Sequence, residues 1–141
     1  MAAKTPQPAS DSTKTVLAHV ENTLDPIIFP DSRVLLLGSM PSPKSREIGF
    51  YFGNPQNRFW RVVAALYGEK LLKSISEKID FCKRHHLALC DVLKACDIKG
   101  ASDASIANPI PHNIGALIQD SSICAIFTLG GTATKFYRRY T

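Results

Sequence analysis

The stretch VLLLGSMPSPKSREIGFYFGNPQNRFW, from Val34 to Trp60, decides which fold the 141-residue chain adopts. Its first residues form an apolar run that ends at Gly38, and a loop of small and polar residues follows. An apolar run without alternation is typical of a strand that is buried on both faces, as in a parallel sheet covered by helices. The stretch therefore predicts an α/β fold in which this strand leads through a loop into a helix.

A helix start is predicted near the end of this stretch. Asn54 is a favourable N-cap and Pro55 a favourable first helical residue, and apolar residues then recur at helical spacing until Gly68. This prediction places Asn57 in the first helical turn. The free N–H groups and the positive end of the helix dipole would then lie beside its side chain.

The rest of the chain continues the alternation of strands and helices. Buried strands are predicted at Leu87–Leu93 and Ile123–Leu129. The other expected elements are a helix over Leu71–Arg84 with a Ser74–Glu77 capping box, a polar loop over 99–113, a short helix near Ile114–Gln119 and a final helix after Gly130. Alternation of this kind implies one α/β domain with right-handed crossovers.

The first residues of the chain differ in composition from the rest. Residues 1–15 are polar and proline-containing, so they are expected to form a disordered leader before a domain over 16–141. Residues 16–30 could hold a short helix followed by an extended segment.

Composition limits the kinds of partner and site. The formal net charge of +5 favours a polyanionic partner without requiring one. The four cysteines form no CxxC pair and follow no apolar signal segment, which indicates an intracellular protein with reduced thiols. Their intervals resemble no compact ligand set, so we expect no metal site. No apolar run is long enough to span a membrane.

Three loops should meet at one edge of the predicted sheet, because ligands of open parallel α/β sheets bind outside the carboxyl ends of the strands. These loops cover residues 38–57, 91–113 and 130–132. Neither GxxxxGK[ST] nor GxGxxG occurs in them. The sequence therefore does not indicate a nucleotide-binding domain of those two kinds.

Residues in these loops allow a functional and a structural interpretation. The aromatic run Phe50–Phe52 could belong to the core or stack on a base. Asn57 could position a water or a developing anion, or only cap the helix. Asp91 could be held by structural hydrogen bonds or read the N–H edge of a ligand. Basic residues around the first loop could be ordinary surface charges or bind an anion, and they are Lys44, Arg46, Arg58 and Arg61.

Three motifs carry a resemblance to a known family. LLLGSMPSPKSREIGFYFGNPQNRFW, LALCDVLKACDIKGASDASI and IFTLGGTATKFYRRY closely resemble the DNA-deoxyinosine (hypoxanthine-DNA) glycosylases of the uracil-DNA glycosylase superfamily, and more distantly the mismatch-specific uracil glycosylases. The resemblance runs from Leu24 to Tyr140. It implies a three-layer α/β/α fold with a central parallel sheet, and a monomeric enzyme without cofactor or metal. Such an enzyme flips a deaminated base out of DNA and hydrolyses its N-glycosidic bond.

The resemblance also implies roles for individual residues. Gly38 to Ser42 matches the first motif of the superfamily, but Met40 stands where relatives often carry an Asp or Asn that handles the attacking water. Asn57 is the candidate that takes over this role. The residues expected to bind the base are Ser39, Met40, Tyr51, Phe52 as the stacking ring and Asp91. Those expected to hold DNA phosphates are Ser42, Lys44, Ser45, Gly130 and Gly131.

One departure from the family leaves alternatives open. The chains of relatives continue into another strand and a second motif, whereas this sequence ends at Thr141. We therefore expect Ile123–Leu129 to form an unpaired apolar sheet edge. This departure leaves open an inactive remnant that binds DNA weakly through its basic residues or does not fold stably. A preference for uracil over hypoxanthine is a separate alternative, because both bases share a lactam edge and pocket size decides between them.

Overall fold

The chain folds around a parallel sheet with β2 in the middle. The computed structural model describes residues 16–141, so the predicted leader lies outside the described residues. The parallel sheet has the order β3-β2-β6, and its strands are β2 (Val34–Gly38), β3 (Leu87–Asp91) and β6 (Ala125–Thr128). This confirms the predicted α/β class and the predicted place of the first apolar run.

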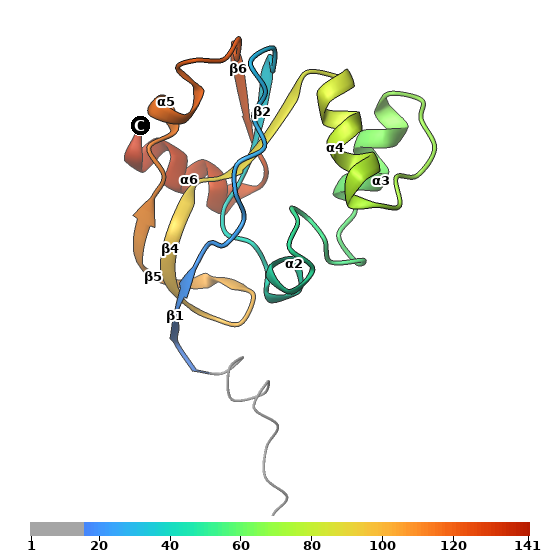
Figure 1. Cartoon of the computed structure of the whole chain (residues 1–141). Coiled ribbons are helices and arrows are strands. Elements are labelled where there is room, and N and C mark those ends of the chain that lie inside the picture. The colour runs from blue at the N-terminus through green and yellow to red at the C-terminus, as the bar shows by residue number, and fades with distance from the viewer. Residues whose placement is uncertain (1–15) are drawn as a thin grey trace, which may run out of the picture.

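Helices cover both faces of this sheet, as Figure 1 shows. Leu35 and Leu37 point to one face, where they pack with Phe136 of α6 (Gly131–Tyr140) and with α5 (Ile114–Ile118). Leu36 points to the other face, which is covered by α3 (Phe59–Leu66) and α4 (Ile75–Arg84). The alternation of side chains along a strand thus divides one apolar run between two cores. A further short helix, α2 (Pro43–Ile48), follows β2.

A second sheet, which the sequence did not predict, lies beside the first. It is antiparallel, and its order is β1 (Ala18–Glu21), β4 (Leu93–Lys99) and β5 (Ser102–Pro111). The prediction of a helix within residues 16–30 is therefore wrong, and so is the prediction of a loop over 99–113. Strand β5 was missed because it is largely exposed and polar and its pairing with β4 contains register shifts, so no apolar alternation marks it.

Two predicted helices begin later than expected. Asn54 opens a tight turn, in which the N–H of Asn57 donates to the Asn54 carbonyl at 2.8 Å, and α3 begins only at Phe59. Helix α4 begins at Ile75, where the Ser74 hydroxyl accepts from the N–H of Glu77 at 3.0 Å. The capping signal at Ser74 was therefore a better guide to the helix start than the apolar spacing.

The predicted apolar edge is present in the described part of the chain. Strand β6 pairs only with β2, and Phe127 on it is 57% exposed. Between β6 and α3 lies an apolar groove of about 530 Å³, and Phe127 and Leu66 are among its lining residues. No helix within residues 16–141 is both long and apolar enough to cross a membrane.

Two phenylalanines offer a matched test of this arrangement. Phe81→Ala removes a fully buried ring from the core beneath α4 and should lower the free energy of unfolding by about 3–5 kcal/mol. Phe127→Ala removes the same atoms from the exposed edge and should cost less than about 1 kcal/mol. Urea denaturation measures both. Equal costs would show that the β6 edge is covered in solution.

Candidate functional site

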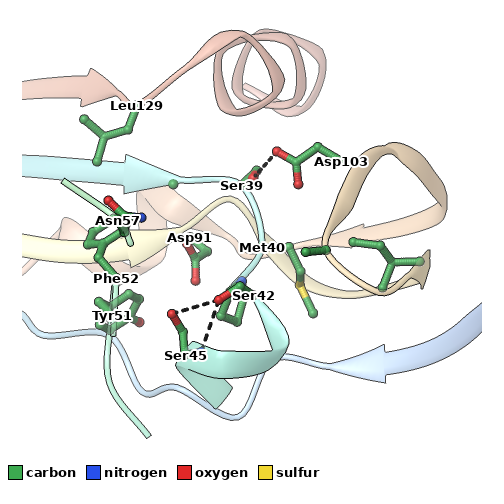
Figure 2. Close-up of a pocket in the computed structure, with 14 residues that line it drawn as sticks. Ser39, Met40, Ser42, Ser45, Tyr51, Phe52, Asn57, Asp91, Asp103 and Leu129 are labelled. Carbon is green, nitrogen blue, oxygen red and sulfur yellow. Dashed lines mark hydrogen bonds between the residues drawn. The ribbon is translucent and has the colours of Figure 1, made fainter. Parts of the chain in front are cut away.

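A cavity of about 220 Å³ opens at the carboxyl ends of β2 and β3 (Figure 2). The structure brings together there most of the residues that the sequence singled out. Those lining it are Ser39, Met40, Ser42, Ser45, Tyr51, Phe52, Asn57 and Asp91, whereas Lys44, Gly130 and Gly131 do not line it. Pockets for drug-sized ligands have volumes of about 300–1,000 Å³. This cavity therefore suits one small flat group.

The close approach of β2 and β3 fixes the floor of the cavity. Gly38 pairs with Asp91 in the parallel ladder. A Cβ atom at Gly38 would lie 2.6 Å from Oδ1 of Asp91 and 3.5 Å from the ring of Phe52. The carboxyl group of Asp91 therefore occupies the space that a side chain at position 38 would fill.

Asp91 has a buried carboxyl group, and one of its two oxygens accepts a hydrogen bond. It is 3% exposed, and its Oδ2 accepts a hydrogen bond from Nδ2 of Asn22 at 3.1 Å. The same amide group of Asn22 also donates to the Leu93 carbonyl at 3.0 Å, which fixes its orientation. Burial raises the pKa of Asp91 to about 7, against the opposing effect of the Asn22 hydrogen bond. The group can therefore carry a proton near neutral pH.

Asp103 is a second carboxyl group at the cavity that sequence analysis did not single out. It lies on β5, and its Oδ2 accepts from the Ser39 hydroxyl at 3.1 Å, as the dashed line in Figure 2 marks. Its charge also raises the pKa of Asp91. Because β5 was predicted as part of a loop, only the expected meeting of the three loops could have pointed to Asp103.

The aromatic run divides between core and cavity. Phe50 and Tyr51 are buried, and the Tyr51 hydroxyl donates to the Asp25 carbonyl at 3.0 Å. Phe52 is only half-buried, and its ring packs against Phe59 with centroids 4.1 Å apart. Its backbone has φ = 53°, which is strained for a large side chain. Phe50 thus belongs to the core, whereas Tyr51 and Phe52 line the cavity, and stacking of Phe52 on a base stays a prediction.

Asn57 lies beside the start of α3 and not inside it, which corrects its predicted place in the first helical turn. Its Oδ1 accepts from the N–H of Phe59 at 2.9 Å, and its side chain is exposed and lines the cavity. The amide oxygen therefore satisfies one free donor of the helix. The Nδ2 group of Asn57 makes no hydrogen bond to any of residues 16–141, so it is free to donate to a ligand or a water.

Comparison with known proteins identifies the family. Residues 26–140, which include every residue that lines the cavity, match the family described as the uracil DNA glycosylase superfamily. The chain belongs to this superfamily. The match confirms the superfamily that the three motifs indicate.

The superfamily match is supported by individual proteins. A Methanosarcina acetivorans protein named hypoxanthine DNA glycosylase is 36% identical over 83 residues, which are 58% of this chain and 52% of the relative. A Methanosarcina barkeri protein of the same name is 34% identical over 82 residues, 57% and 52% of the two chains. The chain thus spans about half the length of the curated relatives it matches. A solution NMR structure from Methanosarcina acetivorans, described as a candidate uracil DNA glycosylase, is 26% identical, with a TM-score of 0.74 over 84% of this chain and 75% of that one.

In this member of the superfamily, the residues predicted to hold phosphates lie in different settings. Ser42 caps α2 by accepting from the N–H of Ser45, and the buried Ser45 hydroxyl accepts from the N–H of Gly53 at 3.0 Å. These hydroxyls therefore fasten the loop that carries Phe52. Lys44 is exposed, and Gly130 and Gly131 form an exposed start of α6 with no acidic residue in its first turn. Phosphate binding by these residues stays a prediction.

The burial of Asp91 makes a prediction about stability and pH. Between about pH 4 and pH 7 the folded protein keeps a proton that the unfolded chain has lost, so its stability falls as the pH rises through this window. Asp91→Asn removes this penalty. The variant should match the wild type near pH 4 and exceed it above pH 7 by a few kcal/mol, since each unit of pKa shift is worth about 1.4 kcal/mol.

Urea denaturation at pH 4 and pH 8 measures this difference. Asp120→Asn is the matched control, because Asp120 is an exposed carboxyl group away from the cavity, and it should leave the stability unchanged at both pH values. A constant difference between wild type and Asp91→Asn would contradict the raised pKa of Asp91.

The contact at Gly38 can be tested by a double-mutant cycle. Gly38→Ala places a methyl group against Oδ1 of Asp91 and should lower the free energy of unfolding by about 1–3 kcal/mol. In the Asp91→Ala background the same change should cost clearly less, because the clashing oxygen is gone. Additive effects would show that Asp91 does not occupy the space beside Gly38.

Proposed function

We propose that the protein is a monofunctional DNA glycosylase that hydrolyses the N-glycosidic bond of deoxyinosine in DNA, with deoxyuridine as a second candidate substrate. The observation that carries this proposal is a cavity of single-base size whose floor is the buried carboxyl group of Asp91. The names of the two curated relatives favour hypoxanthine. Because those relatives are matched over only half their length, the activity is a proposal for this chain.

The cavity offers polar groups and an apolar wall to a flipped base. Asp91 at the floor can bond a base edge, and Ser39 at the rim is held by Asp103. One edge of the Phe52 ring faces the space beside Gly38, and Phe59 supports the ring from behind. Stacking on such an aromatic ring is worth about 1–3 kcal/mol per base. Together these groups suit a planar base that has left the duplex.

Asn57 is the residue that we assign to the attacking water. Its free Nδ2 group lines the same cavity as Asp91, and its Oδ1 is anchored to the start of α3. A fixed amide of this kind can hold a water against the sugar carbon as the bond to the base breaks. Met40 is 8% exposed and packs in the core, which fits a role as cavity wall rather than in handling water.

The proposed partner is DNA containing deaminated bases. Exposed cations near the cavity loops, Lys44, Arg58 and Arg61, could hold the phosphates on either side of the flipped base. A cavity of this volume admits a base but not the duplex around it. We further propose that the protein acts inside the cell and that it is a monomer. Sedimentation or gel filtration would test the monomeric state.

Single-turnover cleavage of labelled duplexes tests the proposed activity. Duplexes carrying deoxyinosine, deoxyuridine or no lesion are incubated with excess protein, and alkali then breaks any abasic sites. Cleavage at deoxyinosine is expected, and cleavage at deoxyuridine would broaden the substrate class. The absence of cleavage at both lesions would overturn the proposal.

Two neighbouring asparagines separate catalysis from loop structure. Asn57→Ala should slow cleavage at deoxyinosine by about 10²-fold or more, the usual loss for one catalytic donor. Asn54→Ala is the matched control, because the Asn54 side chain makes the same kind of hydrogen bond, to the N–H of Gln56 at 3.0 Å, but does not line the cavity. Equal losses in the two variants would reduce Asn57 to a structural role.

A further inference from the structure

The two oxygens of the Asp91 carboxyl group have different surroundings. Oδ2 accepts from the Asn22 amide at 3.1 Å, so a proton on the carboxyl group belongs on Oδ1. Oδ1 accepts no hydrogen bond from any of residues 16–141, and it lies against the bare Cα of Gly38 at the floor of the cavity. A protonated Asp91 therefore presents an O–H donor to whatever fills the cavity.

The groups that face Asp91 favour this protonated form. Asp103 on β5 is a like charge at the same cavity, and no Lys or Arg within residues 16–141 forms an ion pair with Asp91. Tyr51 lies in the loop after α2, and burial raises its pKa well beyond the usual value. Cys90 lies on β3 itself, and burial raises its pKa to about 12. Both groups are therefore neutral at pH 7. Asn22, which follows β1, is neutral at any pH.

An O–H donor at the floor of the cavity selects among bases by their acceptors. A purine such as hypoxanthine presents N7 and O6 side by side on one edge. Uracil has no counterpart of N7. A donor aimed at that edge can therefore stabilise a departing purine more than a departing pyrimidine.

We propose that Asp91 is the general acid of the reaction and protonates N7 of the departing hypoxanthine. This inference rests on the proposed glycosylase function. The proton on Oδ1 moves to N7, the bond between C1′ and N9 breaks, and its electron pair stays on N9, so the base leaves neutral. Water held by Asn57 adds to C1′ and releases a proton, which returns Asp91 to its acid form.

The pH dependence of single-turnover cleavage tests the proposal. With wild-type protein and a deoxyinosine duplex, the rate should be constant at low pH and fall about tenfold per pH unit above neutrality. Asp91→Asn should reduce the rate by about 10²-fold or more and abolish this dependence, because an amide cannot transfer a proton. Asp120→Asn, on the exposed carboxyl group far from the cavity, should keep both the rate and the pH profile.

A substrate analogue separates proton transfer from base binding. A duplex with 7-deaza-2′-deoxyinosine carries C–H in place of N7, so wild type and Asp91→Asn should cleave it at the same slow rate while wild type still binds it. Hypoxanthine release that is as fast in Asp91→Asn as in wild type would overturn the general-acid role alone. Release of 7-deazahypoxanthine from the analogue as fast as release of hypoxanthine from the deoxyinosine duplex would do the same. Wild type that cleaves deoxyuridine but no deoxyinosine would also overturn the general-acid role alone, and wild type that cleaves neither lesion would overturn the proposed function as well.

Discussion

The register that pairs Gly38 with Asp91 is the constraint on which the cavity depends. Parallel pairing sets the ends of β2 and β3 side by side, and the missing side chain of Gly38 lets the carboxyl group lie directly over the strand end. Slipping the register by one residue would turn Asp91 to the opposite face of the sheet. Such a slip would also unseat Leu35 and Leu37 from one core and Leu36 from the other, so the packing of the two cores opposes it.

The cavity wall depends on this sheet through a chain of packed groups. Trp60 of α3 donates from its ring nitrogen to the Tyr51 carbonyl at 2.9 Å and stacks on Phe50, so the helix holds the aromatic loop in place. The same loop contains Phe52, whose backbone is strained at φ = 53°. A strained residue persists only where its surroundings determine it fully. The ring that faces the cavity is thus positioned before any ligand arrives.

Sequence patterns predicted the parts of the fold that rest on local physics. The apolar run of β2 and its end at Gly38 could be predicted directly, because burial on both faces leaves no polar residue in the strand. The start of α4 could be predicted from the Ser74–Glu77 capping box, which is also a local signal. The start of α3 could not, because Asn54 and Pro55 suit a tight turn as well as a helix start.

The site was predicted best where one strand carries it and least where the second sheet contributes. Asp91, Phe52 and Asn57 stand in or beside elements with a clear pattern, and all line the cavity. Asp103 stands on β5, whose exposed and irregular pairing leaves no trace in the sequence. Its place is set by the β4–β5 hairpin, whose pairing closes at Lys99 and Ser102, and the irregular register of this hairpin leaves no apolar alternation to reveal it.

The central position of β2 also has a consequence for how the chain folds. Val34 pairs with Leu87 on one side and with Ala125 on the other, so neither partner is near it in sequence. Closing such long loops costs chain entropy before any sheet contact forms, which makes folding slow. During synthesis β2 emerges well before β3 and β6, so its apolar residues stay unpaired until these strands follow. The yield of native protein is therefore decided by the competition between sheet closure and aggregation.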